Sequence, residues 1–508
     1  MLYKSVAPLL KIGSLAVLFF LLLFASGSYP TCPGFVGSVM QETDSVLQNE
    51  SSQWMIFLCL LIYLNSFIFL RCLAENSSTP NRKILNPLVG MASFTDRKSQ
   101  RYAPNFWFAC TMFSNAVIYA IHYQCSIPAI TLLAGAFIGK GVAFCKNIET
   151  KETKLGVLNF CIALLIALLV LVSVWSIDSR IYVYQAHTRW TGLWKNPNIF
   201  GLLMGMAIAL VVGLLATLFE RPLAQTCNRP LSAGQRLPLR LWIYYSNYFL
   251  YLFAVIFLGR GLLHSYSRGA WVGTAGGLGY LVCRVSRQMR KTEGEIVETS
   301  AAKSAITNRQ ARISSGSFIS RFRCNLGPLF VILACIAFLA FLHFRQPEGH
   351  LARRAVSATN PADFSWRNRI VAWEGDLQIM VEHPWFGTGW NQPEQIYDHY
   401  YLPPKLTESA AIQMNDYLLL GATLGIPALF CFGMYLWLSL AGNAESGKLK
   451  AELMDAEWLQ TTCRAGAIVL LIGFWFDGGL FKLPTAATFW ILLELGNGRH
   501  ELHEGQKQ

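Results

Sequence analysis

Three short segments of the chain combine arginine with tryptophan, glycine or amide side chains. They are residues 189–198 (RWTGLWKNPN), 264–271 (HSYSRGAW) and 366–373 (WRNRIVAW). A guanidinium group donates paired hydrogen bonds to phosphate oxygens and keeps its proton at physiological pH. Each such charged hydrogen bond contributes about 1.5–3 kcal/mol. Together these segments could bind a phosphate or diphosphate group. The candidate side chains are Arg189, Asn198, Ser267, Arg268, Arg367, Arg369 and Trp373.

The composition indicates the solvent in which such a site would form. Hydrophobic residues make up 53% of the 508 residues and charged residues 14%, whereas soluble globular chains carry roughly 25% charged residues. These values indicate a protein surrounded largely by lipid, and they exclude intrinsic disorder, collagen and small disulfide scaffolds. The net charge is +13, from 42 Lys and Arg against 29 Asp and Glu. Because the basic residues lie in short loops between apolar runs, we expect them to set membrane orientation and not to bind nucleic acid.

Apolar runs long enough to cross a bilayer recur along the chain. A spanning helix needs about 20 mainly apolar residues, and about twelve runs qualify, so the predicted fold class is an all-α polytopic membrane protein. The first run could instead be a cleaved signal peptide; we expect a retained helix, and cleavage leaves the remaining topology unchanged. The candidate spans are residues 8–26, 54–74, 105–121, 125–145, 156–177, 198–219, 242–264, 270–284, 325–344, 412–441, 464–481 and 484–497.

The charges of the loops predict the orientation of these helices. Loops 82–101, 221–240 and 284–323 are rich in Lys and Arg, whereas loop 27–53 has three acidic residues and no basic ones. By the positive-inside rule the three basic loops and both termini are cytoplasmic. The Ser- and Thr-containing stretch 292–318 is typical of a mobile cytoplasmic insertion.

The predicted helices divide the chain into three regions. Residues 1–177 hold helices one to five, residues 178–441 form the core, and residues 442–508 hold the last two helices and a cytoplasmic tail. The core includes cytoplasmic loop 285–323 and an outer loop, 345–411, between helices nine and ten. A loop of that length is usually functional or disordered. Because this loop is rich in Trp, Tyr and His, we expect a small folded element lying on the membrane.

The predicted topology places all three arginine segments on the outer face. Arginine is disfavoured there, so Arg268, Arg367 and Arg369 are candidates for a function. Two simpler interpretations stay open: Arg268 could be an interfacial arginine with its head group in water, and the tryptophans could form an aromatic belt. The glycine pairs with GxxxG spacing are most simply helix-packing contacts. These pairs are Gly201 with Gly205 and Gly269 with Gly273.

At these residues the chain resembles the O-antigen ligase and polymerase superfamily of bacterial envelope enzymes. The similar elements occur in the family's order over about residues 180–430. They are Arg189…Gly192…Asn196-Pro197-Asn198, Ser267-Arg268-Gly269-Ala270, Arg369-x3-Trp373-x6-Met380-x3-Pro384-x2-Gly387-x-Gly389 and Asn415-Asp416-Tyr417-Leu418…Leu424-Gly425-Ile426.

The resemblance implies a twelve-helix glycosyltransferase of the bacterial inner membrane. Such enzymes move a glycan from a polyprenyl diphosphate carrier to a lipid or glycan acceptor on the periplasmic face, without a metal or other cofactor. Membrane lipid surrounds the site, and nucleic acid is not a partner. By motif position the two family arginines are Arg268 and Arg369, which would stabilise the departing diphosphate. His383 and Asn415 are further candidates for substrate contacts.

The sequence departs from the family at the histidine that accepts a proton. The family's His-Asn pair reads Met414-Asn415 here, and a thioether cannot take a proton from a hydroxyl at neutral pH. Glu408 and Asp416 are nearby replacements, and His383 and His399 lie in the outer loop. Helix capping and compensation of the helix dipole are the simpler roles for the two carboxylates.

Several classes of function remain open at this point. The motifs fit a ligase and a polymerase equally, and Met414 leaves room for a non-catalytic member. A carrier for lipid-linked glycans is a further alternative, although transporters usually place ionisable residues near the middle of the membrane. The chain lacks a DxD pair and a Walker A loop, so we expect neither nucleotide-sugar transfer nor ATP hydrolysis.

Overall fold

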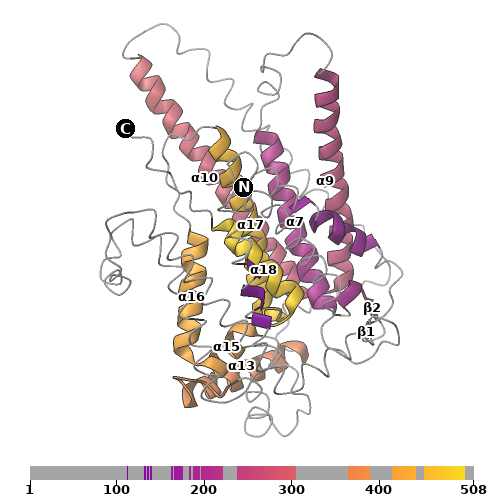
Figure 1. Ribbon diagram of the computed structural model, residues 1–508, viewed down its shortest axis with the longest axis vertical. Coiled ribbons are helices and arrows are strands. Elements are labelled where there is room, and N and C mark those ends of the chain that lie inside the picture. Colours follow the sequence, from indigo (N-terminus) through magenta and orange to yellow (C-terminus); the bar gives the residue numbers. More distant parts are fainter. Residues whose placement is uncertain are drawn as a thin grey trace, which may run out of the picture.

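The computed structural model describes residues 165–174, 187–194, 196–220, 237–304, 364–389, 415–441 and 451–497, with isolated positions between 111 and 184. Within these residues the chain is helical apart from one short antiparallel hairpin, which confirms the predicted helical fold class (Figure 1). The hairpin pairs β1 (Tyr182–Tyr184) with β2 (His187–Arg189), and the 3₁₀ helix η2 (Gly192–Trp194) follows it. The helices are α7 (Pro197–Glu220), α9 (Leu237–Ser265), α10 (Arg268–Ser304), α13 (Phe364–Glu382), α15 (Asp416–Leu424), α16 (Ile426–Ala441), α17 (Ala451–Phe476) and α18 (Leu483–Gly496).

Helix α7 lies at the centre of the bundle. It packs against α9, α10, α17 and α18, and its residues from Ile199 to Leu215 are buried. A helix that is apolar on every face is stable only when other helices or lipid cover all of it. The prediction of a helix over 198–219 is therefore confirmed, and α7 is the core helix.

Glycines allow the central helices to approach each other closely. A Cβ on Gly201 would lie 2.6 Å from Ser265 Oγ, and a Cβ on Gly273 would lie 2.5 Å from the carbonyl oxygen of Val469. Gly205 faces Thr274 in the same way. The interpretation of these glycines as helix-packing contacts is confirmed, because side chains at these positions would force the helices apart.

Among the described residues, two helical segments are long and apolar enough to cross a membrane, Pro197–Ala216 and Glu457–Phe476. Large apolar side chains are also exposed on the outside of the bundle, as expected where lipid replaces water. The most exposed of them on α9 and α16 are Phe249, Leu250, Phe253, Phe430 and Trp437. The predicted spans 8–26, 54–74, 105–121 and 325–344 lie outside the described residues, so the count of twelve stays a prediction.

The prediction of one continuous helix over 412–441 is wrong. The chain forms α15 and α16 instead, and they are separated at Gly425, whose φ of +87° is not helical. Pro427, the second residue of α16, adds to the break because proline lacks the N–H that a continuous helix would use. The short helix α15 is therefore free to lie beside α13 at the end of the bundle (Figure 1).

The first part of the predicted cytoplasmic loop 285–323, which includes the start of the predicted mobile stretch 292–318, is helical. Helix α10 continues to Ser304, so residues 285–304 of the predicted loop 285–323 are helical. This stretch contains no proline and many good helix formers, such as Arg, Gln, Met, Lys, Glu and Ala. Its polarity, which suggested a loop, is compatible with a helix that extends beyond the apolar part of the bundle.

Candidate functional site

Asp477, the residue that follows α17, joins two segments of the candidate site. Its Oδ1 accepts a hydrogen bond from Nη2 of Arg369 at 3.0 Å, and its Oδ2 accepts one from the hydroxyl of Ser267. The side chains of Arg369 and Asp477 are 9% and 3% exposed, so water hardly screens this ion pair. A single carboxylate thus links α13 and the start of α10 at the end of α17.

Ser267 and Gly269 bring the N-terminus of α10 to Asp477. The Ser267 Oγ accepts a hydrogen bond from the Ala270 N–H at 3.1 Å, so Ser267 caps the helix. A Cβ on Gly269 would overlap the Asp477 carboxylate and would lie 2.8 Å from Phe476, so only glycine fits there. Arg268, between them, is the half-buried first residue of α10. A helix N-terminus that carries a guanidinium group favours the binding of an anion.

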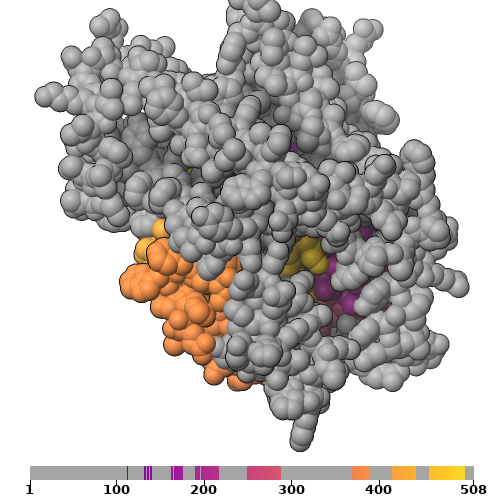
Figure 2. All heavy atoms as spheres, turned by 60° about the horizontal axis from the view of Figure 1, so that its bottom comes forward, coloured from indigo at the N-terminus to yellow at the C-terminus, as the bar shows by residue number. Residues whose placement is uncertain are grey.

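Helix α13 buries two charged side chains and exposes some of its apolar ones. Arg369 and Asp376 are 7% and 0% exposed, whereas Leu377 and Val381 are 50% and 76% exposed. The segment forms part of the molecular surface at this end (orange in Figure 2). Helix α13 therefore holds two charged groups in the interior and offers part of its apolar surface to something other than water.

The turn between α17 and α18 also holds the start of α15. Asp416 Oδ2 accepts a hydrogen bond from the Leu480 N–H at 2.6 Å. The preceding residue, Asn415, is the cap: its Oδ1 accepts from the N–H groups of Tyr417 and Leu418. Burial lowers the pKa of Lys482 in the same turn, although the charges of Asp416 and Asp477 oppose that shift. Asp416 and Asn415 thus have structural partners here.

Aromatic rings line the side of the site formed by α13 and α17. The ring of Trp373 packs edge-on against Trp366 at 6.1 Å and against Trp475 at 5.8 Å. Trp366 also contacts Phe476, next to Asp477. These rings form an apolar cluster beside Asp477.

Arg189 lies at the same end of the bundle but makes internal contacts. Its Nε donates to the Ser265 carbonyl oxygen at 2.8 Å, and its Nη2 donates to Asn198 Oδ1 at 2.9 Å. Asn196 caps α7 through its Oδ1, which accepts from the Asn198 N–H at 2.9 Å. Arg189 therefore ties β2 to the start of α7 and the end of α9, which fixes the turn that contains Ser267.

The two glycine-containing motifs of the sequence dock onto each other. The backbone of residues 384–389 bonds to α15 and α16 through Ile426 N–H to Pro384 O, Thr388 N–H to Ala422 O, and Gly389 N–H to Thr423 O, at 2.8–3.0 Å. Gly387, Gly389 and Gly425 all have positive φ. The break after α15 and the turn after α13 thus form one interlocked connection, which holds α13 across the end of the bundle.

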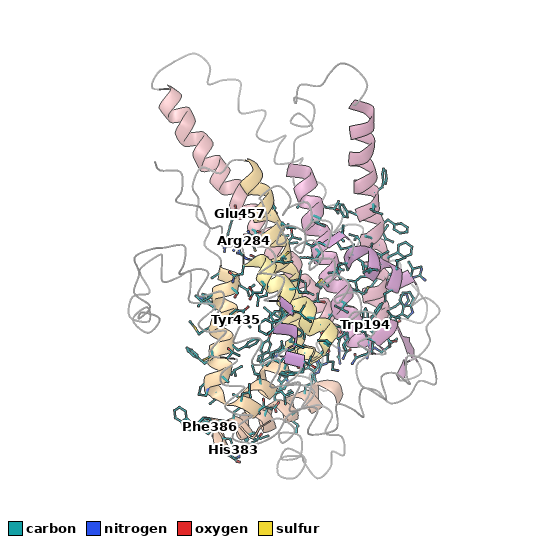
Figure 3. The ribbon with its side chains drawn as sticks, in the orientation of Figure 1. Trp194, Arg284, His383, Phe386, Tyr435 and Glu457 are labelled. Carbon is teal, nitrogen blue, oxygen red and sulfur yellow. The ribbon has the colours of Figure 1, made fainter. Side chains whose placement is uncertain are left out.

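The remaining predicted site residues lie apart or outside the described residues. His383 is exposed at the C-terminal end of α13, as Figure 3 shows. The Arg367 side chain, Glu408, Met414 and His399 lie outside the described residues. Arg284, near the middle of α10, is well separated from His383 in Figure 3.

Sequence reasoning missed Asp477, Lys482 and Asp376. Asp477 directly follows the apolar run of α17, and its partners are 210 and 108 residues away in the chain. An ionisable residue beside two glycines at the end of an apolar run was the available signal. Asp376 was missed because it lies in the predicted outer loop 345–411, where helix α13 had not been predicted.

The geometry defines a helical protein with a charged, aromatic-walled site at one end of its bundle. Residues 253–433, from α9 to α16, match the family model described as O-antigen ligase. The resemblance inferred from the motifs is thereby confirmed for this region. No curated protein matches the chain significantly.

Proposed function

We propose that the protein is a glycosyltransferase of the bacterial inner membrane. It moves a glycan from a polyprenyl diphosphate carrier to a lipid or glycan acceptor on the periplasmic face. The observation that carries this proposal is the meeting of Arg369 and the Arg268-bearing N-terminus of α10 at Asp477. Two arginines and a helix N-terminus supply the positive potential that a departing diphosphate needs.

The reaction is a single displacement. The acceptor hydroxyl attacks the anomeric carbon, the bond from that carbon to the diphosphate oxygen breaks, and the electron pair leaves with the diphosphate. Arg268 and Arg369 bind the oxygens on which this negative charge grows. Asp477 positions Arg369 before the donor arrives, so that little reorganisation is needed when charge develops.

The distribution of charge and apolar surface supports a periplasmic site. The basic residues Arg284 and Arg287 lie on α10 far from its N-terminus, and basic segments favour the cytoplasmic side. The exposed apolar side chains of α13, such as Leu377 and Val381, fit the boundary of a bilayer. Donor and acceptor lipids would reach the site from that boundary.

Reconstitution of the purified protein in liposomes without ATP tests the function. The donor is a polyprenyl diphosphate-linked glycan, and the acceptors are lipid A-core and a second carrier-linked glycan. A new glycosidic bond on lipid A-core identifies a ligase, and one on the carrier-linked glycan identifies a polymerase. Translocation of the donor across the bilayer without a new glycosidic bond would overturn the proposal. Binding of the donor with neither translocation nor a new glycosidic bond would also overturn it.

A further inference from the structure

Asp376 is the one described aspartate at this end of the bundle whose carboxylate has no partner. It is completely buried, and neither Oδ1 nor Oδ2 takes part in a hydrogen bond. The carboxylate of Asp477 is bound by Arg369 and Ser267, and that of Asp416 by the Leu480 N–H. An ionisable group buried without partners is unfavourable for folding, so its presence calls for another explanation.

Asp376 shares one face of α13 with Arg369 and Trp373. The three residues are spaced i, i+4 and i+7, which places their side chains on one stripe of a helix. Arg369 Nε and Trp373 Nε1 are also buried without a hydrogen-bond partner. The stripe therefore presents two unused donors beside an unused acceptor, although Arg369 is anchored through its Nη2.

The cap residue of α15 contributes a third unused donor. Helices α13 and α15 both start near the 477–480 turn, through Arg369 to Asp477 and Asp416 to Leu480. Further along, a Cβ on Gly421 would lie 2.7 Å from Met380 Cε, so the two helices run in the same direction. Asn415 caps the start of α15. Its Nδ2 is buried and has no partner.

Resting on the proposed function, we propose that Asp376 accepts the proton of the acceptor hydroxyl during glycan transfer. The hydroxyl hydrogen passes to a carboxylate oxygen of Asp376, and the hydroxyl oxygen bonds to the anomeric carbon. The bond to the diphosphate breaks, and its electrons leave with the diphosphate held by Arg268 and Arg369. The unused N–H groups of Trp373 and Asn415 orient the hydroxyls of the incoming acceptor.

The surroundings of Asp376 suit this role. Burial raises the pKa of its carboxyl well above the ordinary value, and a proton acceptor works best when its pKa approaches the working pH. The apolar contact between α13 and α15 is a small cluster, separate from the main core. Its buried members are Ala372, Ile379, Met380, Leu418 and Ala422.

The decisive variant is Asp376→Asn, which keeps the shape of the side chain but cannot accept the proton. We expect glycan transfer to fall by about 10²–10⁴-fold, the usual contribution of such a group, while binding of the diphosphate-linked donor is retained. The thermal midpoint of unfolding should stay the same or rise, because a buried unpaired carboxyl is removed. If Asp376→Asn folds poorly, Asp376→Leu, which also removes the charge, should show the same loss of glycan transfer. Glu374→Gln, an exposed carboxylate on the same helix, is the matched control and should keep full activity.

Two results would overturn the inference, and they can be told apart. Transfer by Asp376→Asn or Asp376→Leu within twofold of the wild type, while Arg369→Ala is inactive, would reject the role of Asp376 alone. A wild-type protein that forms no glycosidic bond with either acceptor would reject the proposed function and this role together.

Discussion

At the scale of single residues, the ion pair of Arg369 with Asp477 is the contact on which the site depends. Both side chains are almost fully buried and lie 3.0 Å apart. Removing one member of such a pair leaves an uncompensated charge in the protein, which typically costs about 3–5 kcal/mol. The pair also fixes the direction of the guanidinium group before any ligand binds.

We therefore expect Asp477→Ala to lower the thermal midpoint of unfolding in detergent and to weaken donor binding. Arg369→Met should destabilise the Asp477→Ala protein less than it destabilises the wild type, because the arginine has then already lost its partner. A double-mutant cycle measures this difference. Equal effects of Arg369→Met in the two backgrounds would show that the ion pair does not couple the residues.

At the scale of elements, the interlocked turns after α13 and α15 position the site. Gly387 has a φ of +61°, and a Cβ there would overlap the backbone of Thr423. Substitution would separate the 384–389 segment from α15 and release α13 from the end of the bundle. The glycine-containing motifs of the sequence are thus explained by backbone contacts between two distant segments.

Gly387→Ala should make the α13 region more sensitive to limited proteolysis and should reduce glycan transfer. Gly433→Ala is the matched control, because a Cβ on Gly433 in α16 meets no atom within 4 Å. It should change neither property. A Gly387→Ala protein as resistant to protease as the control would contradict the proposed docking.

The sequence predicts the elements whose signals are local. The Asn-Pro-Asn start and the apolar run of α7 gave bounds within one residue of those observed. The break at Gly425 was missed because an apolar run of 30 residues hides a change in backbone direction. Arg268 and Arg369 were expected to lie close together. The link of Arg369 to Ser267, the residue before Arg268, runs through Asp477 and depends on contacts across more than 100 residues, which no local pattern reveals.

At the scale of the whole molecule, the two ends of the bundle differ in charge and chemistry. One end holds Asp477 with its partners, and α10 carries Arg284 and Arg287 toward the other. Figure 3 shows Arg284 and His383 well separated along the bundle. If the helices cross a membrane, these ends face different compartments.

Thiol labelling of intact cells tests this orientation. In a chain whose 13 cysteines are replaced by serine, Glu382→Cys should react with a membrane-impermeant reagent added outside the inner membrane. Arg287→Cys should react only after the membrane is permeabilised. Both side chains are exposed, Glu382 at the end of α13 and Arg287 on α10. Labelling of both from the same side would contradict the predicted topology.

The central claim is that guanidinium groups at the end of the bundle stabilise a departing diphosphate. The most direct measurement compares the ATP-free transfer rates of the wild type, Arg268→Ala, Arg369→Ala and Arg284→Ala in the same liposomes. Arg284 is the control, because it lies on the same helix as Arg268 but 16 residues further along the chain, where it contacts Tyr280. We predict losses of about 10²-fold or more for the first two variants, as for other preorganised donors to a developing anion, and wild-type rates for Arg284→Ala. Equal rates in all four proteins would contradict the claim.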